Sequence, residues 1–385
     1  MNIESESKLT LFEAASIIVG HGVGSGILAV PYIASRTSWP DIILIIAAAY
    51  AVNLLMHLMI AELSLNNGGK QFIKCFEVEL FKGKMKRFFT GFAFAMLGLS
   101  VLLNVSGFIS GSAAVFSSWF GWNTRVSMIV YYILAASVVF LGMKAVGIGE
   151  KIAVSAMTVV IATLFIATLK SPVSALPSKL VAGQNLLALY GGVSFSLSAV
   201  MSVPQAVKGL GGDVKKIRTS IIAGTGFNVL LLILVTAMTL LGAGSDISQN
   251  GALVDLSAHL GGWVSVIGYL FSLLALSTSL WANTLNLRDI VHEQINIGLK
   301  PSWVIASVPS LILALIGIQS FVGFTRLAGV IQVLTGIAII LAYNKSRKER
   351  NLQSPVCGLF GKLPFQIIVV TGSLLATVGS VLKVL

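Results

Sequence analysis

The chain is poor in charge, in cysteine and in catalytic motifs. Only 10% of its 385 residues are charged, 56% are hydrophobic, and two are cysteines. A soluble domain of this length carries far more charge, so a soluble enzyme or binding module is excluded. The sequence has no HExxH zinc motif, no phosphate-binding P-loop and no GxSxG nucleophile elbow. We therefore expect no enzymatic activity and no cofactor, and active transport would have to draw on an ion gradient.

Long apolar runs take the place of the missing charge. A helix needs about 20 apolar residues to cross the hydrocarbon core, and runs of that length recur with short links between them. We therefore expect one all-α polytopic membrane domain over residues 1–385, with about eleven transmembrane helices. The predicted spans are 10–34, 41–66, 88–119, 126–143, 148–169, 185–208, 217–242, 262–290, 302–318, 322–343 and 364–383.

The net charge of +12 reflects membrane topology rather than a nucleic-acid partner. If the N-terminus is inside, 20 of the 26 Lys and Arg residues lie on the cytoplasmic side of the predicted spans. Such a bias predicts a cell-membrane protein with a cytoplasmic N-terminus and an external C-terminus. The six outer residues are Arg36, Arg125, Lys170, Lys179, Arg326 and Lys383.

Two spans contain helix-breaking residues at matching positions. Residues 20–31 read GHGVGSGILAVP, and residues 190–204 read YGGVSFSLSAVMSVP. Glycine frees the backbone and proline removes a donor, so both helices should open there. The second break lies five spans after the first, an odd number, which predicts an inverted repeat (10–169 and 185–343, with 364–383 outside it) typical of secondary transporters. Two ordinary proline kinks are the alternative.

The two breaks predict a cradle for an amino acid. Amides at an opened helix N-terminus suit a carboxylate, and carbonyls at an opened C-terminus suit an ammonium group. Close helix packing by small residues is the alternative reading. The expected substrate-binding residues are Gly22, Val23, Gly24, Ser25 and Gly26 in the first span and Ser194, Phe195, Ser196 and Ser198 in the sixth.

Hydroxyl groups in the eighth span predict an ion site beside this cradle. Thr278 and Ser279, with carbonyls near Gly20 and Val23, offer oxygen ligands to Na⁺. Alternatively, these hydroxyls bond back to their own helix. His21 lies inside the first break, where it either couples a proton to transport or acts as a neutral filler. The sequence leaves the coupling ion open between H⁺ and Na⁺.

Two buried acids near the inner ends of their spans are expected to be structural or gating residues. Glu62 precedes Asn66-Asn67-Gly68-Gly69, which suggests a gate or a loop anchor. Asp289 follows Arg288, which suggests a structural ion pair.

Four segments resemble the amino acid–polyamine–organocation superfamily, in particular its amino acid/auxin and hydroxy/aromatic amino acid permeases (tryptophan/tyrosine permease-like). The segment from Gly20 to Pro31 is similar to the first-span signature of these permeases. Ala61-Glu62-Leu63 with Gly68-Gly69 is similar to a motif of the wider superfamily at the end of the second span. Ile109-Ser110-Gly111 and Leu276-Ser277-Thr278-Ser279-Leu280 add weaker likenesses.

The resemblance implies that Gly22, Gly24, Ser25 and Gly26 contact the substrate, and that Thr278 and Ser279 lie where Na⁺-coupled relatives bind their ion. It also implies a scaffold of spans three, four, eight and nine around a moving bundle of spans one, two, six and seven. Residues 196–204 lack the phenylalanine and histidine of bacterial aromatic permeases, which counts against an aromatic substrate.

We therefore predict an ion-coupled (H⁺ or Na⁺) symporter for a neutral amino acid, working in the lipid bilayer by alternating access. A non-transporting amino-acid sensor on the same fold is the alternative, and a channel is a third class. No filter pattern supports a channel. The sequence leaves the oligomeric state open.

Overall fold

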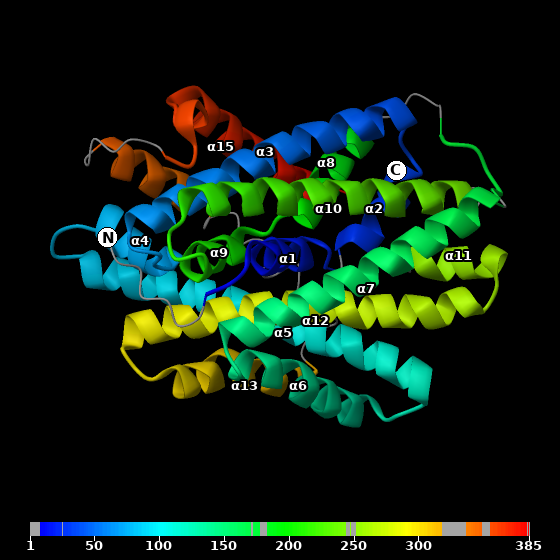
Figure 1. Ribbon diagram of the computed structural model, residues 1–385, viewed down its shortest axis with the longest axis horizontal. Helices are drawn as coiled ribbons and strands as arrows, with labels where there is room; N and C mark the ends of the chain where they lie inside the picture. The colour runs from blue at the N-terminus through cyan, green and yellow to red at the C-terminus, as the bar shows by residue number, and fades with distance from the viewer. Residues whose placement is uncertain are drawn as a thin grey trace.

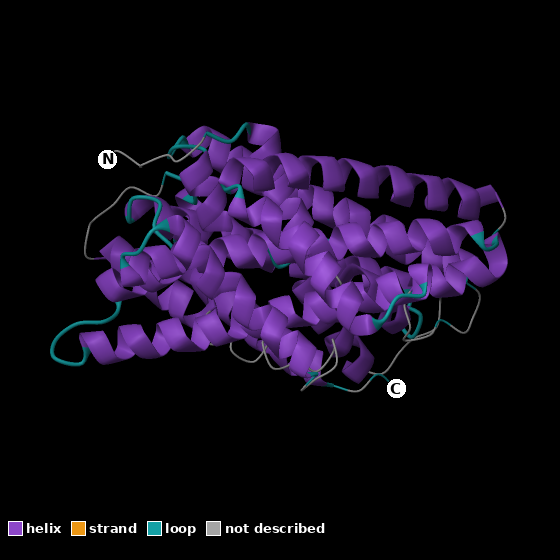
Figure 2. Cartoon of the chain, turned by 90° about the horizontal axis from the view of Figure 1, so that it is seen from below, coloured by secondary structure: helices purple, strands orange, loops and turns teal. Residues whose placement is uncertain are grey.

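The structure is a computed structural model in which every regular element of the described residues is a helix (Figure 1). The helices run side by side along the long axis of the molecule (Figure 2). The described residues are 8–24, 26–170, 172–177, 183–243, 247, 252–317, 336–348, 355–382 and 384.

The helices alternate with short links. Their bounds are α1 (Leu11–Gly22), α2 (Gly26–Ala34), α3 (Trp39–Asn66), α4 (Phe72–Glu79), α5 (Lys86–Phe120), α6 (Thr124–Phe140), α7 (Met143–Lys170), α8 (Gly183–Leu197), η1 (Val200–Ser202), α9 (Val203–Gly209), α10 (Val214–Gly242), α11 (Ala252–Leu260), α12 (Trp263–Ile295), α13 (Leu299–Ile316), a helix at 336–348, η2 (Gly358–Gly361) and α15 (Leu363–Val381).

Among the described residues, eight helices are long and apolar enough to cross a membrane if Gly183–Gly209 is counted as one span, which supports the predicted polytopic fold. The bent pair α1 and α2 makes a ninth if it is counted as one span. Helix α6 is apolar but shorter, at 17 residues. Much of the predicted span 322–343 lies outside the described residues, so the count of eleven stays a prediction, as does the inverted repeat.

Local sequence explains where the first helix begins. Thr10 accepts a hydrogen bond from the Glu13 amide at 3.2 Å, and Glu13 accepts one from the Thr10 amide at 2.8 Å. This capping box satisfies amides that the helix itself leaves free. Lys144, one residue into α7, reaches the same Glu13 carboxylate at 2.6 Å. The start of α1 is thereby fixed against α7.

The long helices form two groups with α7 between them. Helices α5, α6, α12 and α13 all pack against one another. In the other group, α3 packs against α10, α8 and α9, and α10 also packs against the short helices α1, α2, α8 and α9 of the broken spans. Helix α7 contacts α1 and α10 on one side and α12 and α6 on the other, and it runs diagonally between the groups in Figure 1. The groups correspond to the bundle and scaffold that the resemblance implied.

The last helix is packed tightly along one side only. A Cβ at Gly191 of α8 would lie 2.5 Å from the Ser380 amide nitrogen, so the backbones of α8 and α15 touch. Large apolar side chains, including Ile367, Leu374 and Val381, are exposed on α15. An exposed apolar surface of this kind suits contact with lipid.

Candidate functional site

The first predicted break is present between α1 and α2. Helix α1 ends at Gly22, α2 begins at Gly26, and their axes are bent by 52°. The Val23 amide still donates to Val19 at 2.8 Å, and the Ile27 amide donates to Gly24 at 3.3 Å. Backbone groups at both new helix ends are therefore available for partners outside the helix. Ser25, a predicted substrate residue, lies outside the described residues.

The sixth predicted span is also interrupted, although Gly183–Gly209 still counts as one candidate span without the sharp bend of the first. Helix α8 ends at Leu197, and the chain passes through the short turn η1 before α9 starts at Val203. The freed Ala199 amide donates to Nε2 of His57 at 3.0 Å, and the freed Met201 carbonyl accepts from Asn286 at 3.1 Å. Side chains of α3 and α12 thus stabilise open backbone inside the protein, as a membrane interior requires.

The two breaks lie against each other. A Cβ at Gly22 would lie 3.3 Å from the Ser196 carbonyl oxygen. A Cβ at Gly26 would lie 2.7 Å from Ser196 Oγ and 3.0 Å from the Phe195 ring. On the other side, Nδ1 of His21 is 2.8 Å from Ser202 Oγ. The structure therefore brings Gly22, Gly26, Phe195 and Ser196 together as the cradle requires.

Two other cradle residues, Ser194 in the last turn of α8 and Ser198 just after its end, have no described contact with the first break. Ser194 is buried, with 8% of its surface exposed. The Ser198 amide donates to Phe195 at 3.1 Å, which closes the last turn of α8. Their roles as substrate ligands stay predictions.

The predicted ion-site residues meet at the end of α1. Thr278 Oγ1 donates to the Gly20 carbonyl at 2.9 Å and lies 3.0 Å from the Ala275 carbonyl. A Cβ at Gly24 would overlap Ser279 Oγ, so Ser279 is packed directly against the break. Val23 is 1% exposed. The Thr278 hydroxyl bonds to its own helix, as one interpretation of the sequence expects. It also bonds to the α1 backbone, where the other interpretation places the ion site.

Three buried side chains at this site were missed as site residues in the sequence. Asn228 of α10 donates to the Ile18 carbonyl at 3.3 Å, and a Cβ at Gly22 would overlap its amide. His57 holds the sixth-span break from α3. Glu150 of α7 lies against Gly20. The predicted span began at 148, whereas α7 begins at Met143, so Glu150 lies two turns inside the helix rather than at its end.

The remaining two acids are held by protein groups. Glu62 accepts hydrogen bonds from the Tyr343 hydroxyl and from the Cys357 amide, both at 2.9 Å. Asp289 accepts from Arg288 at 2.7 Å, and Lys208 lies 3.7 Å away. Glu62 thus anchors the segment before α15, and Asp289 forms the expected pair with Arg288.

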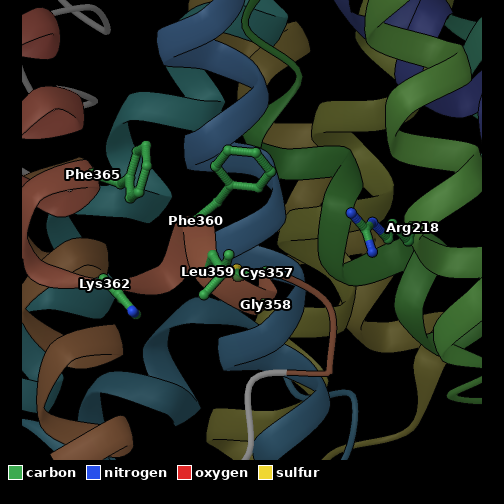
Figure 3. A pocket seen from close by; sticks show the side chains of 7 residues that line it. All are labelled: Arg218, Cys357, Gly358, Leu359, Phe360, Lys362 and Phe365. Carbon is green, nitrogen blue, oxygen red and sulfur yellow. The ribbon is translucent and has the colours of Figure 1, made fainter.

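The anchored segment borders a pocket of about 480 Å³ (Figure 3). Cys357 lines it, together with Arg218 from the start of α10 and the rings of Phe360 and Phe365. Burial raises the pKa of the Cys357 thiol above its usual value. The thiol is therefore neutral and unreactive at physiological pH.

The fold and the paired breaks define a multi-pass membrane transporter. The chain belongs to the tryptophan/tyrosine permease family, whose sequence profile matches residues 7–379. This confirms the resemblance seen in the sequence. The chain is accordingly an amino-acid transporter of the secondary type rather than an enzyme. No curated protein matches the sequence significantly.

Solved structures support the same fold. The structure of MhsT in complex with L-phenylalanine is similar with a TM-score of 0.74 and 15% identity, covering 98% of this chain and 100% of that one. Mhp1 is a nucleobase-cation-symport-1 family transporter, solved in a closed conformation with bromovinylhydantoin bound. It is similar with a TM-score of 0.67 and 12% identity, covering 98% of this chain and 92% of that one.

Proposed function

We propose that the protein is a cell-membrane symporter that carries a neutral amino acid into the cell together with H⁺ or Na⁺. The contact between the two breaks is the observation that carries this proposal. Opened helix ends place amides and carbonyls side by side, which is what the carboxylate and ammonium groups of an amino acid require.

The surroundings of the cradle favour a neutral side chain on the substrate. The described side chains packed against its glycines are Asn228, Ser196, Ser279 and Phe195, none of which carries a charge. A charged substrate side chain would need a buried partner to offset its desolvation. The family name and the L-phenylalanine in MhsT direct attention to aromatic amino acids, whereas Ser198 and Ala199 favour a smaller or more polar substrate.

The predicted orientation follows from the charge bias. With a cytoplasmic N-terminus, the basic links face the inside of the cell. Substrate from outside would then reach the breaks about halfway along the spans, since Gly20 lies nine residues, or about 14 Å, from the start of α1.

Substitution at Gly24 tests the cradle. Gly24→Leu would drive a side chain into Ser279 and across the break, so amino-acid binding should fall below detection. Binding is measured by scintillation proximity with the radiolabelled amino acid that gives the largest thermal shift among the twenty. Gly91→Leu is the matched control, because a Cβ at Gly91 meets nothing within 4 Å.

Equal binding by the wild type and Gly24→Leu would contradict the cradle assignment. Binding by the wild type without any uptake into vesicles would favour the sensor function instead.

A further inference from the structure

Glu150 is a fully buried carboxyl group without a partner among the described residues. It is 0% exposed, and neither carboxyl oxygen makes a hydrogen bond. It lies seven residues into α7, about 10 Å from the helix start. Buried charges in proteins are normally paired, hydrogen-bonded or bound to a metal ion. We therefore expect a ligand to bind at the unpaired Glu150 carboxyl group.

The carboxyl lies where the two helix groups meet. A Cβ at Gly20 of α1 would overlap Oε2 of Glu150 and would lie 2.9 Å from the Cβ of Thr278 on α12. One residue away, a Cβ at Gly149 would lie 3.1 Å from the Trp281 ring, also on α12. Glu150 is thus wedged between the last turn of α1 and the middle of α12. The Thr278 hydroxyl donates to the Gly20 carbonyl at 2.9 Å, so both oxygens belong to residues at this junction.

No nearby charge explains the burial. Lys144 of α7 is paired with Glu13 of α1 at 2.6 Å, and Lys151, the next residue after Glu150, makes no hydrogen bond to it. His21 contacts Ser202 instead, and Tyr131 accepts from Ser277 at 3.3 Å. None of the titratable groups on α7 or on the helices packed against it forms a hydrogen bond or ion pair with Glu150. These groups are Glu13 and His21 on α1; Arg125, Tyr131 and Tyr132 on α6; Lys144, Lys151 and Lys170 on α7; Lys215, Lys216 and Arg218 on α10; and Tyr269, Arg288, Asp289, His292 and Glu293 on α12.

We propose that Glu150 is the carboxylate that binds the coupling cation, a proton or Na⁺, at the junction of α1, α7 and α12. A proton converts the carboxylate to a neutral acid, and Na⁺ neutralises it by direct contact. Either cation removes the cost of burying the charge, so α1 can pack against α7 and α12 as it does here. Without a cation, the charge favours a hydrated arrangement in which α1 moves away. This inference rests on the proposed transport function and names the residue through which the ion acts.

A cation titration of the purified protein tests the proposal separately from transport. The apparent Tm of wild type in lipid nanodiscs is measured against Na⁺, with choline as replacement, and against pH in the absence of Na⁺. We expect Tm to rise with one of the two cations. Glu150→Gln should lose this dependence, and Glu77→Gln, on the short helix α4, should retain it. Glu150→Asp keeps the charge but withdraws it by one methylene, so it should need about tenfold more cation.

The Na⁺ titration and the pH titration together identify the coupling ion. A Na⁺ response that Glu150→Gln removes assigns Na⁺, and a pH response that it removes assigns the proton. A wild type that responds to neither, or a full response in Glu150→Gln, overturns the proposal. If Glu150→Gln does not fold, a wild-type response in Glu150→Asp overturns it equally.

Amino-acid binding at saturating cation is measured on the same samples. The proposed function fails if the wild type binds and transports no amino acid. The role of Glu150 fails if the cation response does not depend on this residue.

Discussion

At three glycines at or just beyond the end of α1, side chains from other helices occupy the space that a Cβ would need. A Cβ at Gly20 would overlap Glu150, one at Gly22 would overlap Asn228, and one at Gly24 would overlap Ser279. Each glycine lets a polar side chain from a different helix reach the backbone of α1. The glycine run therefore both opens the helix and makes room for its partners.

The hydroxyl of Thr278 provides a single-atom test of the contact between α1 and α12. Thr278→Val keeps the shape but removes the hydrogen bond to Gly20, which should cost about 0.5–1.5 kcal/mol. The apparent Tm in detergent should fall by roughly 1–2 °C. Thr163→Val is the control, since Thr163 is exposed on α7 and bonds only within its own helix. Equal Tm values for the two variants would show that the Thr278 contact adds no stability.

At the level of the helix, the sequence predicts the breaks well and their partners poorly. The Gly-rich run before Val30-Pro31 and the serines before Val203-Pro204 correctly placed both interruptions, because glycine and proline act on their own backbone. His57, Asn228 and Glu150 come from other helices far away in the chain. Their roles depend on packing, which a single sequence does not specify.

Span boundaries show a second limit of the sequence. The predicted spans 126–143 and 148–169 correspond to α6 (Thr124–Phe140) and α7 (Met143–Lys170). Hydropathy placed the basic residue Lys144 in the link, whereas the structure places it in α7, paired with Glu13. This shift of five residues moved Glu150 from a helix end to a buried position.

The segment before α15 depends on one side chain of α3. Glu62 accepts from both Tyr343 and the Cys357 amide, and Glu62→Gln has only one acceptor oxygen for the two donors. The segment should open, so the Cys357 thiol should become exposed and its raised pKa should fall toward the ordinary value. In a Cys75→Ser background, the rate of maleimide labelling at pH 7 should rise at least about tenfold.

Raising the pH provides the control for this labelling experiment. Because burial raises the pKa of the Cys357 thiol, the parent protein should label slowly at pH 7 and faster at higher pH, where more thiolate forms. If Glu62→Gln leaves the labelling rate at pH 7 unchanged, Glu62 does not anchor this segment.

Across the whole molecule, α7 joins two groups of helices that otherwise differ in structure. The group containing α3 and α10 includes both broken spans, whereas α5, α6, α12 and α13 are continuous helices. Continuous helices make a rigid support, and broken ones provide hinges at the point where substrate would bind. In the mechanism that we propose, one group moves against the other, with α7 between them, and the cradle opens in turn to each side of the membrane.

Concentrative uptake tests this account most directly. Purified protein is reconstituted into liposomes with an imposed proton or Na⁺ gradient, and the radiolabelled amino acid that binds best is added outside. If transport is ion-coupled, internal amino acid exceeds the external concentration under one gradient, and an ionophore that collapses the gradient abolishes the excess. Accumulation that never exceeds equilibrium under either gradient, by a protein that still binds the amino acid, would contradict ion-coupled transport.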